Sequence, residues 1–257
     1  MMAKYDGRFI WYELMTTDMK AAQAFYSEVI GWEVEPFEGA PMPYTLWKVA
    51  EQSVGGCMVL PEEARAAGAL PHWEGYVQVE DVDAIVRQAE ALGGKCVAPA
   101  SDIPEVGRFA TVADPQGAML SVFKPAREGE MTVPDPLRPG DFSWHELATT
   151  DHSAGFGFYS ALFGWELLED MEMGEGMIYR LYGFGEEQLG GMYTQPAETK
   201  GPPGWLYYLK VEDVDAAVAR IEASGGKVVM GPHEVPGGSR VAQALDPLGA
   251  TFAVHGK

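Results

Sequence analysis

The sequence has few cysteines, few basic residues and no long apolar run. Its 257 residues include two cysteines, Cys57 and Cys96, which do not have the spacing of a zinc site. No apolar run approaches the roughly 20 residues that span a bilayer, and the N-terminal residues contain no apolar signal region. These absences predict a cytoplasmic protein whose two cysteines are small, buried packing residues.

The charge of the chain is strongly one-sided and restricts its partners. There are 18 basic residues against 38 acidic ones, which gives a net charge of −20. A field of this sign repels phosphate backbones and anionic lipids, so we expect no nucleic-acid partner and no membrane partner. The chain also contains no glycine-rich phosphate loop, no GxSxG nucleophile turn and no HExxH zinc motif.

One stretch occurs twice and divides the chain. Residues 9–33 and 142–166 are identical at 14 of 25 positions, at an offset of 133. Further along each half, residues 73–95 and 205–227 are identical at 14 of 23 positions. The repeat predicts a first domain over 1–125 and a second over 141–257. The proline-rich segment 126–140 is predicted to be an extended, fairly stiff linker.

Each domain is itself predicted to contain two copies of one pattern. Residues 8–15 alternate as a strand with two distinct faces, Asp18 offers a helix N-cap, and 19–30 form an amphipathic helix that Gly31 ends. Three short strands follow. After a connector at 61–71 the pattern returns as a strand at 72–79, a cap at Asp81, a helix at 82–92 and strands at 95–99, 108–113 and 118–124. The expected class is α+β, with four βαβββ modules in two pairs.

Several motifs within these modules carry a resemblance to a known family. They are Phe25-Tyr26 followed by Gly31-Trp32, Val79-Glu-Asp-Val-Asp83, the segment Asp102–Ala110, and the turn Asp114-Pro-Gln-Gly117. With their copies in the second half, they resemble the vicinal oxygen chelate superfamily of glyoxalases, bleomycin-resistance proteins and extradiol dioxygenases. The resemblance covers nearly the whole chain and is greatest to tandem members such as a mycobacterial secreted-antigen and hydroxylase-like group. It implies that each domain is a curved eight-stranded half-barrel around a cavity, with helices outside.

The resemblance also locates where metal-dependent members bind a divalent ion. Four strand positions supply the ligands there. In the first domain they fall on Trp11, Gly55–Met58, Glu74 and Ser121, and in the second on Trp144, Gly190–Tyr193, Leu206 and Ala253. Indole cannot ligate a metal, and only Glu74 is a plausible donor in the set. We therefore predict no metal and no cofactor in either domain.

The same positions predict an aromatic ligand site instead. Strand alternation places Phe9, Trp11 and Glu13 on one face, and their copies Phe142, Trp144 and Glu146 on the matching face. The aromatic side chains, with Glu74 and Ser121, are predicted to bind a flat or apolar molecule. Glu13 and Glu146 would anchor it and are the candidate general bases. The alternative is that the tryptophans fill the core and the glutamates pair with nearby donors.

Other polar residues are predicted to be structural. Alternation sends His145 to the opposite face from Trp144 and Glu146, so Trp-His-Glu is not expected to be a cluster in space. His72 shares a face with Glu74 and forms with it the best remaining metal or acid/base pair. Arg108 and Arg240 are expected to bond carbonyl groups or the aspartates of the Asp-Pro-x-Gly turns, with binding of an anionic substrate as the alternative.

Three functions remain open from the sequence. The first is a metal-independent enzyme of the isomerase, lyase or hydroxylase-like kind. The second is a resistance-type protein that sequesters a small aromatic or apolar molecule without turnover. The third is an interaction protein whose cavities are filled. Because two domains are already joined in one chain, we expect a monomer in preference to a homodimer.

Overall fold

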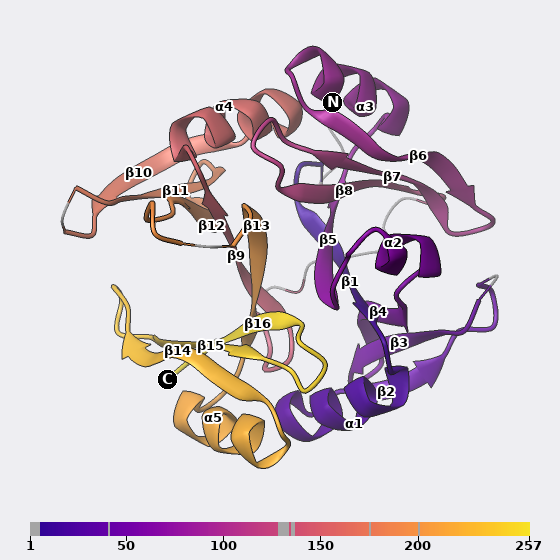
Figure 1. Ribbon diagram of the computed structural model, residues 1–257, viewed down its shortest axis with the longest axis vertical. Helices are drawn as coiled ribbons and strands as arrows, with labels where there is room; N and C mark the ends of the chain where they lie inside the picture. Colours follow the sequence, from indigo (N-terminus) through magenta and orange to yellow (C-terminus); the bar gives the residue numbers. More distant parts are fainter. Residues whose placement is uncertain (1–5, 41, 128–133, 135–136, 175, 200) are drawn as a thin grey trace. The chain divides into compact units, whose positions relative to one another are not determined.

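The fold consists of four copies of the predicted βαβββ module (Figure 1). A computed structural model describes residues 6–40, 42–127, 134, 137–174, 176–199 and 201–257. The first module contains β1 (Phe9–Thr16), α1 (Met19–Ile30), β2 (Glu33–Pro36), β3 (Tyr44–Val49) and β4 (Gln52–Val59). The second contains β5 (His72–Gln78), α3 (Val82–Ala91), β6 (Lys95–Ile103), β7 (Gly107–Ala113) and β8 (Met119–Pro125).

The second half of the chain repeats this order. The third module contains β9 (Phe142–Thr149), α4 (His152–Phe163), β10 (Glu166–Glu172), β11 (Ile178–Phe184) and β12 (Glu187–Thr194). The fourth contains β13 (Gly204–Lys210), α5 (Val214–Ala223), β14 (Lys227–Glu234), β15 (Arg240–Leu245) and β16 (Thr251–Gly256). One short helix, α2 (Glu62–Ala66), lies within the predicted connector 61–71.

The strands form two open, mixed eight-stranded sheets. Their strand orders are β2-β3-β4-β1-β5-β8-β7-β6 and β10-β11-β12-β9-β13-β16-β15-β14. Within a module the first strand pairs in parallel with the last, as β1 does with β4, because the helix crosses between β1 and β2. The predicted α+β fold of paired βαβββ modules is confirmed.

Local signals in the sequence set the helix ends. The side chain of Asp18 accepts a hydrogen bond from the N–H of Ala21 and begins α1, and Asp81 does the same for α3. Gly31 ends α1 with φ +86°, a left-handed conformation that glycine adopts without steric cost. Both predicted N-caps and the predicted end of α1 are confirmed.

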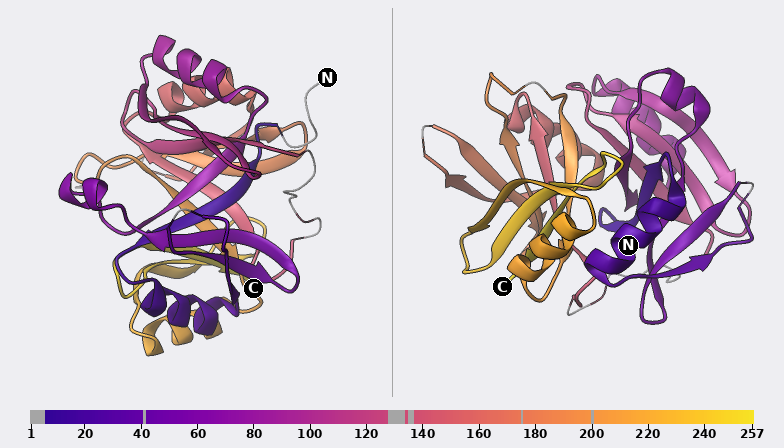
Figure 2. Two further views of the ribbon diagram at one scale, coloured as in Figure 1. Left: turned by 90° about the vertical axis from the view of Figure 1, so that its right-hand side faces the viewer. Right: turned by 60° about the horizontal axis from the view of Figure 1, so that its bottom comes forward.

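Packing groups the modules into two compact units. Unit 1 contains residues 1–10, 75–133 and 144–206, and unit 2 contains residues 11–74, 134–143 and 207–257. Within unit 2, α1 lies beside α5, and within unit 1, α3 lies beside α4 (Figure 2). Most of the predicted linker lies outside the described residues. The proposed domain limits at 125 and 141 follow the repeat, and they stay a prediction.

Each unit has an aromatic core fastened by one buried aspartate. In unit 2, Tyr26 donates a hydrogen bond to Asp246 (3.3 Å) and accepts one from the indole of Trp73 (2.8 Å). Asp246 also accepts hydrogen bonds from its own turn, at the N–H groups of Leu248 and Ala250. Tyr159, Asp114 and Trp205 repeat the arrangement in unit 1. In each unit, the tyrosine of a Phe-Tyr motif and the aspartate of an Asp-Pro-x-Gly motif are therefore hydrogen-bond partners in the core.

The two cysteines differ in exposure, which predicts different reactivity. Cys57 is fully buried, whereas Cys96 is only half-buried, so the expectation that both are buried is correct for Cys57 alone. Burial, with the nearby charge of Glu13, raises the pKa of the Cys57 thiol to about 12. Since the thiolate is the reactive form, native protein should label at Cys96 at least about 100-fold faster than at Cys57.

The measurement is labelling of the Cys96→Ser variant with a chromogenic disulfide reagent. Its single thiol should react only after denaturant is added. Labelling of the native variant at the rate of a free peptide thiol would contradict the placement of Cys57.

Candidate functional site

In unit 2, two predicted site residues are joined by a tyrosine. Trp11 and Glu13 lie two residues apart on β1 and therefore share a face. The indole N–H of Trp11 donates to the Tyr44 hydroxyl (3.1 Å), and that hydroxyl donates to Oε1 of Glu13 (2.7 Å). Both rings are half-buried, whereas Glu13 is 8% exposed. The result is a buried carboxylate beneath two partly accessible aromatic rings.

Unit 1 contains the same arrangement. The indole of Trp144 donates to the Tyr179 hydroxyl (2.8 Å), which donates to Oε2 of Glu146 (2.9 Å). Glu146 is also 8% exposed, and both rings are half-buried. We call these sets the Trp–Tyr–Glu triads: Trp11, Tyr44 and Glu13 in unit 2, and Trp144, Tyr179 and Glu146 in unit 1.

Paired glycines make room for each tyrosine. Gly56 on β4 lies opposite Glu13, and Gly191 on β12 lies opposite Glu146. A Cβ at Gly56 would overlap the Tyr44 hydroxyl, and one at Gly191 would overlap the Tyr179 ring. Each tyrosine thus lies against the strand at the position where metal-dependent relatives are expected to hold a ligand.

The environment keeps the phenols of Tyr44 and Tyr193 protonated. Burial, and then the charge of Glu13, raises the pKa of Tyr44 well above its ordinary value of 10.0. In unit 1 a further phenol, Tyr193 on β12, has its pKa raised to about 12 by burial and by Glu146. The rings of Tyr179 and Tyr193 are stacked, with centroids 6.2 Å apart. The glutamates therefore face hydroxyl groups that donate hydrogen bonds at neutral pH.

The two predicted phenylalanines are packed against other aromatic rings. Phe9 stacks on the imidazole of His145, with centroids 4.0 Å apart, and Phe142 stacks on Tyr12 at 3.6 Å. Both phenylalanines are buried. These contacts give each ring a packing role, and binding of a ligand by Phe9 or Phe142 stays a prediction.

The remaining predicted residues lie on β5 and β8. Glu74 is buried in unit 2, where His72 precedes it by two residues, and Nδ1 of His72 lies 2.7 Å from the carbonyl oxygen of Leu70. Ser121 is fully buried in unit 1, and its hydroxyl lies 2.7 Å from that of Thr111. A ligand-binding role for Glu74 and Ser121 also stays a prediction.

His145 has a structural position although it lies between two triad residues. It is buried, and its Nδ1 lies 2.6 Å from the carbonyl oxygen of Leu189. Burial lowers the pKa of its imidazole from 6.5 to about 4, so the ring is neutral at pH 7. This is the separation from Trp144 and Glu146 that strand alternation predicts.

The residues present do not fit the divalent metal of metal-dependent relatives. The first-strand positions Trp11 and Trp144 present an N–H donor, and Gly56 and Gly191 have no side chain to offer. In the described part of the chain, no three His, Cys, Asp or Glu side chains are close enough to hold an ion.

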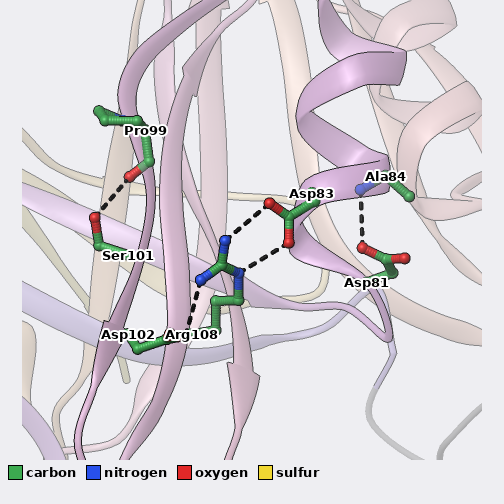
Figure 3. Close-up of polar contacts among 7 residues, drawn as sticks. All are labelled: Asp81, Asp83, Ala84, Pro99, Ser101, Asp102 and Arg108. Atoms are coloured by element: carbon green, nitrogen blue, oxygen red, sulfur yellow. Dashed lines mark hydrogen bonds and ion pairs between the residues drawn. The ribbon is translucent and has the colours of Figure 1, made fainter.

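The prediction that Arg108 and Arg240 bond carbonyl groups or the aspartates of the Asp-Pro-x-Gly turns is wrong. Arg108 forms ion pairs with Asp83 at the start of α3 and with Asp102 on β6, each at 2.9 Å (Figure 3). Arg240 pairs with Asp215 at the start of α5. The turn aspartates Asp114 and Asp246 instead accept hydrogen bonds from N–H groups of their own turns. Both arginine pairs lie at exposed helix starts, outside the triads.

Sequence reasoning missed the tyrosines that complete the triads. Tyr44 and Tyr179 are equivalent at an offset of 135, not 133, because the hairpin between Glu166 and Tyr179 has two residues more than the one between Glu33 and Tyr44. The glycine pairs Gly55-Gly56 and Gly190-Gly191 recur at the same offset. A glycine pair repeated inside two strands was the available signal that a ring lies over the strand.

Comparison with known proteins gives consistent results for both halves. Residues 11–123 match the model of a glyoxalase-like domain, and residues 142–254 match the glyoxalase/bleomycin resistance protein/dioxygenase superfamily. The chain is 33% identical to "Putative glyoxylase CFP32" of Mycobacterium tuberculosis, over 95% of this chain and 92% of the relative. It is 28% identical to the anthracycline biosynthesis protein DnrV of Streptomyces peucetius, over 96% of this chain and 92% of that relative.

Solved structures share the fold at low sequence identity. The 2,3-dioxygenase LapB from Pseudomonas sp. KL28 has a TM-score of 0.68 at 13% identity, covering 100% of this chain and 94% of that one. A Mn(II)-bound glyoxalase from Novosphingobium aromaticivorans has a TM-score of 0.66 at 16% identity, covering 98% of this chain and 82% of that one.

None of the helices in the described ranges is long and apolar enough to cross a membrane.

Proposed function

The chain belongs to the glyoxalase/bleomycin resistance protein/dioxygenase superfamily, and we propose that it binds a small planar aromatic molecule at its Trp–Tyr–Glu triads. The observation that carries the proposal is a buried carboxylate beneath two half-buried rings, built twice from equivalent positions. The faces of Trp11 and Trp144 supply stacking surface, and Glu13 and Glu146 accept a hydrogen bond from a ligand hydroxyl.

Two further observations support a neutral, hydroxylated aromatic ligand. The net charge of −20 disfavours an anionic one. A relative at 28% identity over nearly its full length is named for anthracycline biosynthesis, and anthracyclines contain a planar fused-ring system with phenolic hydroxyls. The proposed ligand class is therefore a neutral hydroxylated aromatic compound.

Proton transfer at the same carboxylates is the second candidate function. Tyr44 donates to Glu13 and fixes its orientation, and Tyr179 does the same for Glu146. A buried carboxylate held in this way can act as a general base on a ligand hydroxyl or an acidic C–H group. This would be metal-independent isomerase or lyase chemistry, whereas sequestration uses the same contacts without turnover. Conversion of a bound ligand, followed by NMR, distinguishes the two functions.

Titration with 1,8-dihydroxyanthraquinone tests the binding proposal. Tryptophan fluorescence should be quenched on binding, and Glu13→Gln or Glu146→Gln should each weaken one site about 10- to 100-fold. That range follows from the roughly 1.5–3 kcal/mol of a hydrogen bond to a charged group. A protein that binds no anthraquinone, phenol or catechol at millimolar concentration would contradict the proposal.

The chain offers matched controls for these variants. Glu51 and Glu186 are equivalent exposed glutamates in the turns before β4 and β12. Glu51→Gln and Glu186→Gln change the charge by the same amount outside the triads, and both should bind as the wild type does. An equal loss of affinity in the control variants would indicate a general charge effect. It would contradict the role of Glu13 and Glu146 in binding.

A further inference from the structure

The third module carries a methionine-rich hairpin on the same face as its triad. Met171 on β10 lies opposite Tyr179 on β11, and two positions nearer the tip the N–H of Met173 donates a hydrogen bond to the carbonyl of Met177. Side chains of directly opposed residues, and of residues two apart, share one face of a sheet. Three thioethers therefore lie on the face that presents the ring of Tyr179.

This face is continuous from the methionines to the carboxylate. Tyr179 lies opposite Tyr193, and Gly191, two residues before Tyr193 on β12, lies opposite Glu146. The strands follow in the order β10-β11-β12-β9, so three strand spacings, or roughly 14 Å, separate the methionines from Glu146. Met173 and Met177 are 46% and 37% exposed, respectively. A single aromatic ring cannot span this distance, whereas a fused system of three or four rings can.

We infer that Met171, Met173 and Met177 form an apolar subsite which extends the unit 1 triad and selects fused polycyclic aromatic ligands. The inference rests on the proposed function, because it assigns the ligand class of the same site. Thioethers suit this role because they are flexible and make favourable contacts with aromatic rings. Glu146 and Tyr193 would hold a hydroxyl at one end of the ligand, and the methionines would cover its apolar end.

The first module does not provide an equivalent extension. Its hairpin is shorter, with β2 spanning Glu33–Pro36 where β10 spans Glu166–Glu172. The residue hydrogen-bonded opposite Tyr44 is Phe37, whose ring packs edge-on against Tyr44 with centroids 6.1 Å apart. Met58 replaces Tyr193 beside the carboxylate strand. Selection for fused rings is therefore assigned to the unit 1 site alone.

Methionine oxidation and affinity together test this subsite. In the Glu13→Gln background, 1,8-dihydroxyanthraquinone should slow hydrogen peroxide oxidation of Met173 and Met177 at least threefold, read by peptide mass spectrometry. Catechol should not do so. The double variant Met173→Ser/Met177→Ser should weaken anthraquinone binding about tenfold and catechol binding less than twofold. Met230, exposed on β14, is the control: its oxidation should not change, and Met230→Ser should bind normally.

The outcomes separate the two proposals. Anthraquinone binding that depends on Glu146, with unchanged methionine oxidation and an unaffected double variant, would overturn the subsite and leave the proposed function standing. Absence of binding by both probes would overturn the function and the subsite together. Equal loss of both probes in the double variant would show a general distortion of the hairpin and would also overturn the subsite.

Discussion

Gly190→Ala is expected to lower the free energy of unfolding by about 3 kcal/mol, near the upper end of what overpacking usually costs. Gly190 lies on β12, paired in parallel with His145 on β9. A Cβ at this position would overlap the carbonyl oxygen of His145 and crowd the hydroxyl of Tyr182. The clash is with backbone, so no side-chain rotation relieves it, and the two strands must move apart.

Urea denaturation of the variant and of a matched control measures this effect. Gly204 also lies in a strand, β13, but a Cβ there meets nothing within 4 Å. Gly204→Ala should therefore change the free energy of unfolding by less than about 0.5 kcal/mol, as a surface substitution does. If Gly190→Ala were as stable as Gly204→Ala, the close approach of β12 and β9 would be disproved.

Acidification from pH 6.5 to pH 4 is expected to remove about 3 kcal/mol of stability through His145 alone. Burial lowers the pKa of the folded imidazole to about 4, whereas the unfolded value is 6.5. Between these values the unfolded chain binds the proton and the folded chain does not. Stability is therefore fully present above pH 6.5 and is lost as the pH falls towards 4, at about 1.4 kcal/mol for each unit of pKa difference.

His145→Gln provides the comparison, because an amide can donate to Leu189 and does not titrate. Unfolding free energies of both proteins should be measured by urea denaturation at intervals from pH 4 to pH 8. The unfolding free energy of the wild type minus that of the variant should fall by about 3 kcal/mol on going to pH 4. Asp114 and Asp246, whose pKa values burial raises, change stability in the opposite sense, and their contribution is common to both proteins. A difference that is constant with pH would contradict the buried, neutral ring.

Much of the fold could be predicted because it is encoded in local signals. Asp18 and Asp81 end strands and begin amphipathic helices, and Gly31 occupies the left-handed position that ends α1. The two-residue period of 8–15 gives the faces of β1 before any tertiary contact is considered. Repetition of these signals in both halves of the chain then gives the number and order of modules.

The partners of these residues could not be predicted, because they come from distant parts of the chain. Tyr26 reaches Asp246 and Trp32 reaches the carbonyl of Gly140, and no local pattern connects either pair. The triads fall between these cases. Strand alternation joins Trp11 to Glu13, but Tyr44 arrives from another strand and depends on the absence of a side chain at Gly56.

The composition of the two units has a consequence for synthesis on the ribosome. Unit 1 is built mainly from 75–133 and 144–206, which emerge one after the other, whereas unit 2 joins 11–74 to 207–257. Between these two large segments the ribosome must add 132 residues (206 − 74), which takes roughly 7–26 s at 5–20 residues per second. Throughout this interval Phe25 and Tyr26 lack their ring contacts with Phe252. A chain that terminates early therefore leaves its first module without the fourth module to pack against. The first module is the one expected to require a chaperone.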